Sequence, residues 1–218
     1  SMTERMVNES GDLLIERDWS ATANFYEMVL LAQSLEIEIA GLLPPGKSMQ
    51  GDSKCVELFE EVGVHTCFNG GKVTIKADPV KIRELSGSRC VVSFDMGGNP
   101  DLVPPLAVGM AMAGIRFELH NVGTLKYKES DRLHALISEL AKFGFVLTVE
   151  GDALCYRGES RGAGAEITVD CRCDHRLSMA FAAAAIKTGK VTIDEKCVAK
   201  SFPDFFEQAE KAGIVMSY

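Results

Sequence analysis

The chain has 218 residues, of which 46% are hydrophobic and 25% charged, and its formal net charge at pH 7 is −8. This composition is typical of a globular protein with one large domain or two small ones, and the acidic balance argues against nucleic-acid binding through bulk charge. Because no apolar run approaches the roughly 18 residues of a membrane helix, the sequence predicts no membrane span.

The cysteines and the N-terminal residues bear on the cellular compartment. Seven cysteines, an odd number, favour a reducing environment over a disulfide framework. Residues 2–11 are polar and charged, unlike a secretory signal. We therefore expect a cytoplasmic protein. Ser1 before Met2 is typical of a cloning remnant, and we interpret residues 1–10 as a terminal segment that precedes the domain.

The predicted elements recur three times along residues 11–218. Each copy reads strand, apolar helix, strand, amphipathic helix and a closing pair of strands. In the first copy, about residues 11–78, the order is LLIER, SATANFYEMVLLA, LEIEIAGL, a helix with Val56, Phe59 and Val62 on one face, and HTCFNGGKVTIKA. The Asn-Gly-Gly sequence inside the last stretch predicts a hairpin turn.

The second and third copies follow the same plan. The second, about residues 88–160, contains CVVSF, LVPPLAVGMAMAG, IRFELHNV, an amphipathic helix and the hairpin FVLTVEGDALCYR. The third, about residues 164–218, contains AEITVDCRC, HRLSMAFAAAAIKTG, KVTIDEKC, a helix and IVMSY. The third copy ends one strand early, so we expect that strand to be absent or supplied from elsewhere.

Aspartates and glycines mark the helix ends in these copies. Glycine follows each amphipathic helix, as is common for helix C-termini: Gly63, Gly144 and Gly213. Aspartate lies at or near the helix starts and is a good N-cap: Asp18, Asp101, Asp174 and Asp204.

Basic residues gather at the strand-to-helix end of each copy. They are Lys47, Lys128, Arg132, His175, Arg176 and Lys200. In one helix alone, ion pairs of Arg132 with its neighbours would explain them. Since the pattern recurs, we expect the cations to meet at one end of the domain, beside positive helix N-termini. Such charges would be arranged around a phosphate or carboxylate ligand and not around each other.

Several stretches resemble one enzyme family. KYKESDRL, DHRLSMAFA, CVAKSFPDFFEQ and KSMQGD are similar to the C-terminal half of 5-enolpyruvylshikimate-3-phosphate synthase (3-phosphoshikimate 1-carboxyvinyltransferase). DWSATANFYE is similar to the first helix start of that half. The resemblance runs in order from about Gly11 to the end of the chain.

The resemblance implies an α/β (α+β) fold, with one domain of three βαβαββ repeats in the inside-out arrangement of enolpyruvyl transferases. The family has two such domains with the substrates between them, so the expected partner is the N-terminal domain of the same enzyme. We expect a monomer that uses no cofactor or metal.

The family transfers the enolpyruvyl group of phosphoenolpyruvate to the 5-hydroxyl of shikimate 3-phosphate, on the route to aromatic amino acids. Addition and elimination proceed through a tetrahedral intermediate, and phosphate leaves. By resemblance, Asp101 matches the acid that approaches the attacking hydroxyl and acts as a base. Glu129 matches the carboxylate that moves a proton to and from the phosphoenolpyruvate methylene.

The other matching residues are implied to bind substrate. Lys128 matches a lysine at the substrate junction, and His175 matches a histidine that helps orient the phosphate. Arg132, Arg176 and Lys200 match cations that hold the phosphate and carboxylate of phosphoenolpyruvate.

The sequence departs from the family pattern in three ways. Thr124 stands where many members have Asn beside the shikimate ring, and Cys173 stands before DHR where Asn is common. The domain that carries most shikimate 3-phosphate contacts is missing, so we predict that the isolated chain is inactive. The alternatives are half of a UDP-N-acetylglucosamine enolpyruvyl transferase, or a non-catalytic module that binds phosphorylated metabolites.

A zinc site is the remaining metal hypothesis. Cys171, Cys173 and His175 alternate along one segment, but they lack a CxxC pair and a second partner motif. Buried thiols are therefore the favoured interpretation of these cysteines.

Overall fold

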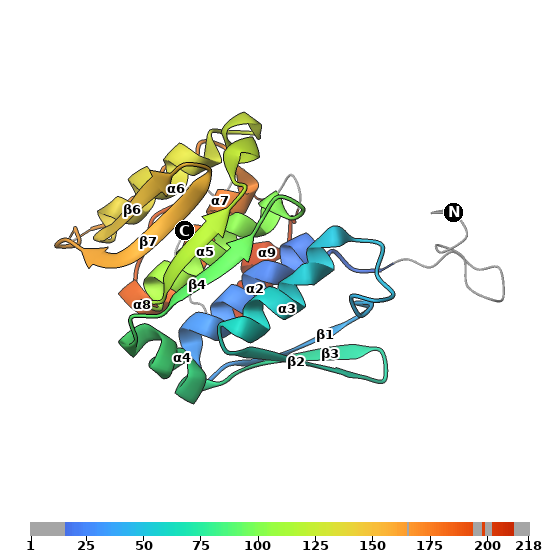
Figure 1. Cartoon of the computed structure of the whole chain (residues 1–218). Helices are drawn as coiled ribbons and strands as arrows, with labels where there is room; N and C mark the ends of the chain where they lie inside the picture. Colours follow the sequence, from blue (N-terminus) through green and yellow to red (C-terminus); the bar gives the residue numbers. More distant parts are fainter. Residues whose placement is uncertain (1–15, 165, 194–197, 199–201, 212–218) are drawn as a thin grey trace.

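The computed structural model describes residues 16–164, 166–193, 198 and 202–211 (Figure 1). The first predicted copy contains, in order, α2 (Trp19–Ala32), β1 (Glu36–Ala40), the 3-10 helix η1 (Gly51–Lys54), α3 (Cys55–Glu61), β2 (Val64–Asn69) and β3 (Lys72–Ala77). A connecting helix that the repeat did not predict, α4 (Pro79–Gly87), leads to the second copy. Asp78 caps α4 by accepting hydrogen bonds from the backbone N–H groups of Val80 and Lys81.

From its apolar helix onward the second copy has the same order of elements, and a strand and a 3-10 helix precede that helix. It contains β4 (Val91–Asp95), the 3-10 helix η2 (Pro100–Leu102), α5 (Val103–Met112), β5 (Arg116–His120), the 3-10 helix η3 (Gly123–Tyr127), α6 (Arg132–Lys142), β6 (Phe145–Glu150) and β7 (Ala153–Ser160). It is followed by α7 (His175–Ala183), α8 (Ala185–Thr188) and α9 (Phe205–Lys211). Among these helices none is long and apolar enough to cross a bilayer.

The two sheets share a topology. The first sheet has the order β1-β3-β2 and is antiparallel, and the second has the order β4-β5-β7-β6 with β4 parallel to β5 and the other pairs antiparallel. In both sheets the strand before the amphipathic helix pairs with the last strand of the copy. The mixed α/β class is therefore confirmed, while the domain limits of 11–218 and the threefold repeat stay predictions.

One backbone hydrogen bond occurs at the same place in both copies. The N–H of Arg17, just before α2, donates to the carbonyl of Gly41, just after β1, at 2.9 Å. The N–H of Met96, just after β4, donates to the carbonyl of His120, the last residue of β5, at 3.0 Å. This match supports two copies of one folding unit.

The predicted turns follow from glycine at positions of positive φ. Gly70 and Gly71 have φ values of 57° and 80° in the two-residue turn between β2 and β3, and Gly151 has φ of 64° in the next hairpin. Gly144 ends the α6 region with φ of 94°, and a Cβ there would lie 2.3 Å from the carbonyl oxygen of Arg161. Only glycine fits this position. Gly213 lies outside the described residues.

The core forms where the apolar helices meet. Helices α2, α5 and α7 pack against one another, and every residue of α5 from Val103 to Ala111 is buried. Helices α2 and α3 cover one face of the first sheet, while α5 and α6 pack on the second (Figure 1). The outer face of the first sheet is charged, with ion pairs of Lys72 with Glu38 and of Lys76 with Glu36. The helices that the sequence marks as apolar, α2, α5 and α7, are therefore the buried ones.

The third copy departs from its prediction. No strand forms over the described residues of AEITVDCRC, where a single parallel bridge joins Thr168 to Thr192. Side chains of the distant helix α6 bind the backbone here instead, with Lys142 donating to the carbonyl of Thr168 and Glu139 accepting from the N–H of Asp170. The end of KVTIDEKC and all of IVMSY lie outside the described residues.

Glu27 on α2 carries a buried carboxyl group that makes the stability of the fold depend on pH. Its side chain is fully buried, and among the described residues neither oxygen has a hydrogen-bond partner. Burial raises the pKa of Glu27 well above its ordinary value, because the charged form is poorly solvated. The folded state therefore keeps the Glu27 proton to a higher pH than the unfolded chain does.

We predict that Glu27→Gln flattens the pH dependence of stability. In the wild type the contribution of Glu27 to the free energy of unfolding is greatest below the ordinary pKa of glutamate, and it falls by about 1.4 kcal/mol per pH unit until the folded-state pKa is reached. Urea unfolding at pH 5 and pH 8 measures this loss, which glutamine cannot show because it does not titrate. The exposed Glu84→Gln is the control. Equal pH slopes in wild type and Glu27→Gln would contradict the prediction.

Candidate functional site

Asp101 lies at the centre of a cluster of charged side chains. It belongs to η2, between β4 and α5, and is partly buried. Its carboxylate lies 2.7 Å from Nη1 of Arg132, 3.0 Å from Nη2 of Arg176 and 3.3 Å from Nζ of Lys128. The interpretation of Asp101 as a helix cap is wrong, since no side chain caps η2 or α5. Its carboxylate faces cations from two other segments instead.

The surrounding cations decide the charge of Asp101. Burial by itself raises the pKa of a carboxyl group, but Arg176, Arg132 and Lys128 outweigh it, so the pKa of Asp101 lies below its ordinary range. The group is therefore ionised at neutral pH. In this arrangement it is also a weaker base than an ordinary aspartate.

Arg132 joins the cluster from the first position of α6. Asp131 caps this helix by accepting from the N–H of His134 at 2.9 Å. The Arg132 side chain is fully buried, and its guanidinium binds three carboxylates: Asp174, Asp101 and Glu129. The contact with Asp174 is forked, with Nε at 2.7 Å and Nη2 at 3.2 Å from the two oxygens.

Asp174 and Ser130 are members of the cluster that sequence reasoning missed. Asp174 was expected only as a cap, and it does cap α7 by accepting from the N–H of Arg176 at 3.0 Å. It is also fully buried, and it accepts from Oγ of Ser130 at 3.0 Å as well as from Arg132. The sequence feature that could have identified Asp174 as a site residue is its position directly before His175 in the DHR motif.

His175 and Glu129 lie at the edge of the cluster. His175 is the first residue of α7 and is partly buried. Burial lowers the pKa of its imidazole, as does the nearby charge of Arg176, while Asp174 and Glu129 act in the opposite direction. The ring is therefore neutral near pH 7 and can donate one hydrogen bond and accept another. Glu129 is exposed apart from its contact with Arg132.

The other predicted site residues are not joined to this cluster by any described contact. Thr124 is exposed in η3, and Lys47 is exposed in the loop after β1. Lys200 lies outside the described residues, so its role stays a prediction. The structure thus brings together Asp101, Glu129, Lys128, Arg132 and Arg176.

The charges are arranged partly around one another. We expected a ring of cations facing a ligand, but Lys128, Arg132 and Arg176 all contact carboxylates of the chain itself. That expectation is wrong for this structure. An anionic ligand would have to share these cations with Asp101 or replace its contacts.

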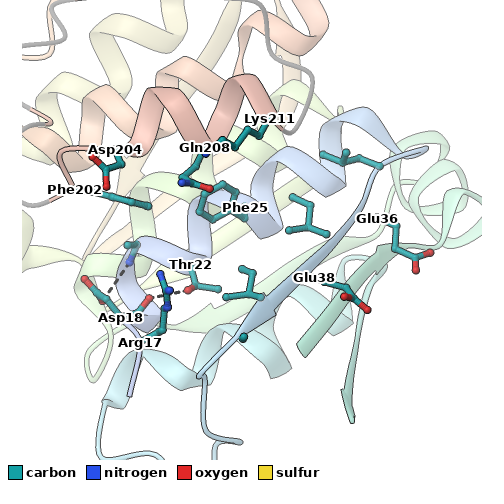
Figure 2. Close-up of a pocket in the computed structure, with 15 residues that line it drawn as sticks. Arg17, Asp18, Thr22, Phe25, Glu36, Glu38, Phe202, Asp204, Gln208 and Lys211 are labelled. Atoms are coloured by element: carbon teal, nitrogen blue, oxygen red, sulfur yellow. Dashed lines mark hydrogen bonds between the residues drawn. The ribbon is translucent and has the colours of Figure 1, made fainter. Parts of the chain in front are cut away.

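A cavity of about 590 Å³ lies elsewhere, between β1, α2 and α9 (Figure 2). Phe25, Ile37, Ile39 and Phe202 supply apolar walls, and charged groups lie at its margin, including Glu36 and Glu38 of β1. None of its described lining residues is a predicted site residue. It runs beside the edge of β1 that no described strand pairs, which accounts for a groove at this place.

The cysteine and metal hypotheses have separate outcomes. Cys171 is buried as expected, but Cys173 is exposed, so the expectation of buried thiols is wrong for Cys173. Over the described part of the chain, no three His, Cys, Asp or Glu side chains are grouped so that they could hold a metal ion.

Comparison with known proteins identifies the family. The model of the family described as EPSP synthase (3-phosphoshikimate 1-carboxyvinyltransferase) matches residues 3–209. The chain belongs to the EPSP synthase family. A relative from Bacteroides fragilis named 3-phosphoshikimate 1-carboxyvinyltransferase is 33% identical over 201 residues, which are 91% of this chain and 47% of the relative. One of the same name from Methanosarcina acetivorans is 35% identical over 92% of this chain and 44% of its own length.

Solved structures show the same fold. An EPSP synthase from Acinetobacter baumannii matches with a TM-score of 0.65 at 22% identity, over 98% of this chain and 54% of that one. The enolpyruvyl transferase NikO from Streptomyces tendae matches with a TM-score of 0.56 at 14% identity, over 92% of this chain and 44% of that one. The chain therefore spans about half the length of the EPSP synthase family members that it matches.

We predict that Arg132→Ala lowers the free energy of unfolding by about 3–5 kcal/mol, because it leaves the buried Asp174 without its partner. Arg157→Ala is the matched control. Arg157 also pairs with two carboxylates, Glu118 and Glu150, but it is exposed, so its removal should cost roughly 1 kcal/mol or less. Urea unfolding at pH 7 measures both. A loss no larger for Arg132→Ala than for Arg157→Ala would contradict the structural role.

Proposed function

We propose that this chain is the C-terminal half of a 3-phosphoshikimate 1-carboxyvinyltransferase, which transfers the enolpyruvyl group of phosphoenolpyruvate to the 5-hydroxyl of shikimate 3-phosphate. The observation that carries the proposal is the contact of Asp101 with Lys128, Arg132 and Arg176. It supplies a carboxylate base among cations suited to a phosphate and a carboxylate. The family match and the names of the relatives support this reaction over transfer to UDP-N-acetylglucosamine.

The cluster suggests how substrate binding activates the base. While Arg176 and Lys128 contact Asp101, the pKa of Asp101 is low and the group is a poor base. The anionic groups of phosphoenolpyruvate would draw these two cations toward themselves. The pKa of Asp101 would then rise, and its carboxylate could accept the proton of the attacking 5-hydroxyl.

The remaining groups account for the second proton and the leaving group. Glu129 enters this cycle in its protonated form and gives its proton to C3 as the 5-oxygen bonds to C2 of phosphoenolpyruvate, while Asp101 holds the proton of the hydroxyl. In the elimination Glu129 takes a proton back from C3, and the C2–O bond to phosphate breaks while the phosphate takes up the proton lost by the hydroxyl. Neutral His175 offers a hydrogen bond to the phosphate without adding charge. Thr124 would contact shikimate 3-phosphate, and Lys200 would add a cation to the phosphoenolpyruvate site.

The partner in this proposal is the N-terminal domain of the same enzyme, which would close over the cluster. We propose a cytoplasmic monomer once both halves are present. No cofactor or metal takes part, because proton transfers and charge stabilisation suffice for the chemistry.

Arg176→Ala tests the binding role. We expect it to weaken phosphoenolpyruvate binding to the chain at least about tenfold, since it removes a charge-assisted contact worth roughly 1.5–3 kcal/mol. Isothermal titration at low salt measures the dissociation constant. Arg157→Ala removes one positive charge far from the cluster in sequence and serves as the control. Equal affinities in the two variants would contradict the proposed site.

Turnover separates the proposed enzyme from a binding module. We expect no phosphate release by these 218 residues alone, and release after the N-terminal half is added together with both substrates. The assay follows inorganic phosphate. Binding of both substrates without turnover by the recombined halves would favour the non-catalytic module, and normal turnover by the isolated chain would refute the dependence on the second half.

A further inference from the structure

Helix α6 holds the segment that leads into α7 through a row of polar contacts. Nζ of Lys142 donates to the carbonyl of Thr168 at 2.9 Å, and the N–H of Asp170 donates to Oε2 of Glu139 at 3.0 Å. Nη2 of Arg172 donates to Oγ of Ser138 at 3.3 Å. The row ends at the Arg132–Asp174 contact of the site. The helix and the segment therefore run alongside each other in opposite directions.

Glu139 is the buried member of this row. Its side chain is only 4% exposed, and both of its oxygens are engaged. Oε1 accepts from Oγ of Ser138 at 3.2 Å, and Oε2 accepts from the N–H of Asp170 and pairs with Lys142. Glu139 lies two helical turns after Arg132, so both buried charges share one face of α6. One face thus holds the segment at Asp170 and again at Asp174.

The segment between these two points has a strained backbone. Arg172 and Cys173 have φ values of 51° and 55°, in the left-handed region that residues other than glycine rarely adopt. Two such residues in succession are energetically unfavourable. The bend lets Asp174 cap α7, and it leaves Arg176 with Nη2 3.0 Å from Asp101. Two hydrogen bonds inside the bend, from the N–H of Arg172 to Asp170 and from the N–H of Asp174 to the carbonyl of Cys171, act together with the contacts at its two ends to hold it in place.

We propose that Glu139 is a positioning residue for the anion site. By accepting the N–H of Asp170 it fixes the start of the bend, and through the bend it sets where α7 begins and where His175 and Arg176 lie. Without this acceptor the N–H of Asp170 loses its partner, and the strained backbone can relax. The inference rests on the proposed function for the ligand of Arg176, but the geometry that Glu139 controls can be measured without that ligand.

The test compares Glu139→Ala with Leu140→Ala in the full 218-residue chain. Leu140 is the next residue of α6, is fully buried in the core and is apolar, so its loss destabilises the helix without removing any of the polar contacts to the segment. Three quantities are measured at a temperature where both variants are folded. They are the hydrogen exchange and chemical shifts of the amides of Asp170, His175 and Arg176, and the dissociation constant for phosphoenolpyruvate.

We expect Glu139→Ala to speed exchange of the Asp170 amide at least about tenfold beyond any change in global stability. It should also move the His175 and Arg176 resonances and raise the dissociation constant about tenfold, equal to about 1.4 kcal/mol. Leu140→Ala should change none of these beyond its global effect. Glu139→Gln keeps an oxygen that accepts the Asp170 N–H, so it should restore most of the protection and the affinity.

Three results would overturn the proposal: an Asp170 amide still protected in Glu139→Ala, unmoved His175 and Arg176 resonances, or equal affinities in Glu139→Ala and Leu140→Ala. If Glu139→Ala does not fold, Glu139→Asp, which withdraws the carboxylate by one methylene, takes its place with the same readouts. If the wild type does not bind phosphoenolpyruvate, the proposed function fails separately. The exchange and shift results then decide the positioning role by themselves.

Discussion

The buried guanidinium of Arg132 is the interaction on which the arrangement of the site depends. A guanidinium cannot be neutralised in a protein, so a fully buried one must find carboxylates within hydrogen-bonding distance. Arg132 finds them in Asp174, Asp101 and Glu129, which come from the start of α7, from η2 and from the turn before α6. The ends of three helical segments must therefore meet for the chain to fold, and the candidate site lies where they meet.

This requirement ties stability to electrostatics. Asp101 serves both as a partner of Arg132 and as the group whose charge Lys128 and Arg176 balance. The cations lower its pKa although burial acts in the opposite direction. An acidic protein thereby keeps cations concentrated at one place, where internal carboxylates bind them. The same charges account for a stable cluster and, under the proposed function, for its response to a phosphorylated acid.

The elements around the cluster explain how a chain about half as long as its relatives can bring these charged side chains together. Helices α2, α5 and α7 bury their apolar surfaces against each other, and each sheet is covered on one face by helices of its own copy. Helix α6 serves two surfaces at once. Its apolar side, including Leu133, Leu136 and Leu140, enters the core, while its polar side holds the segment before α7 through Glu139. Core packing thus orients the polar row.

The sequence by itself determined the features that depend on neighbours along the chain: the buried apolar helices, the hairpin turn at Gly70 and Gly71, and the glycine at position 144. Its motifs also identified the family. Tertiary structure decided that Arg132 is enclosed by carboxylates, that Asp101 faces cations and caps nothing, and that the strand expected near Asp170 does not form in the described residues. These outcomes depend on partners that are distant in the sequence, such as Arg132 and Asp174, which are 42 residues apart, and their approach is set by how the helices pack and not by any local pattern.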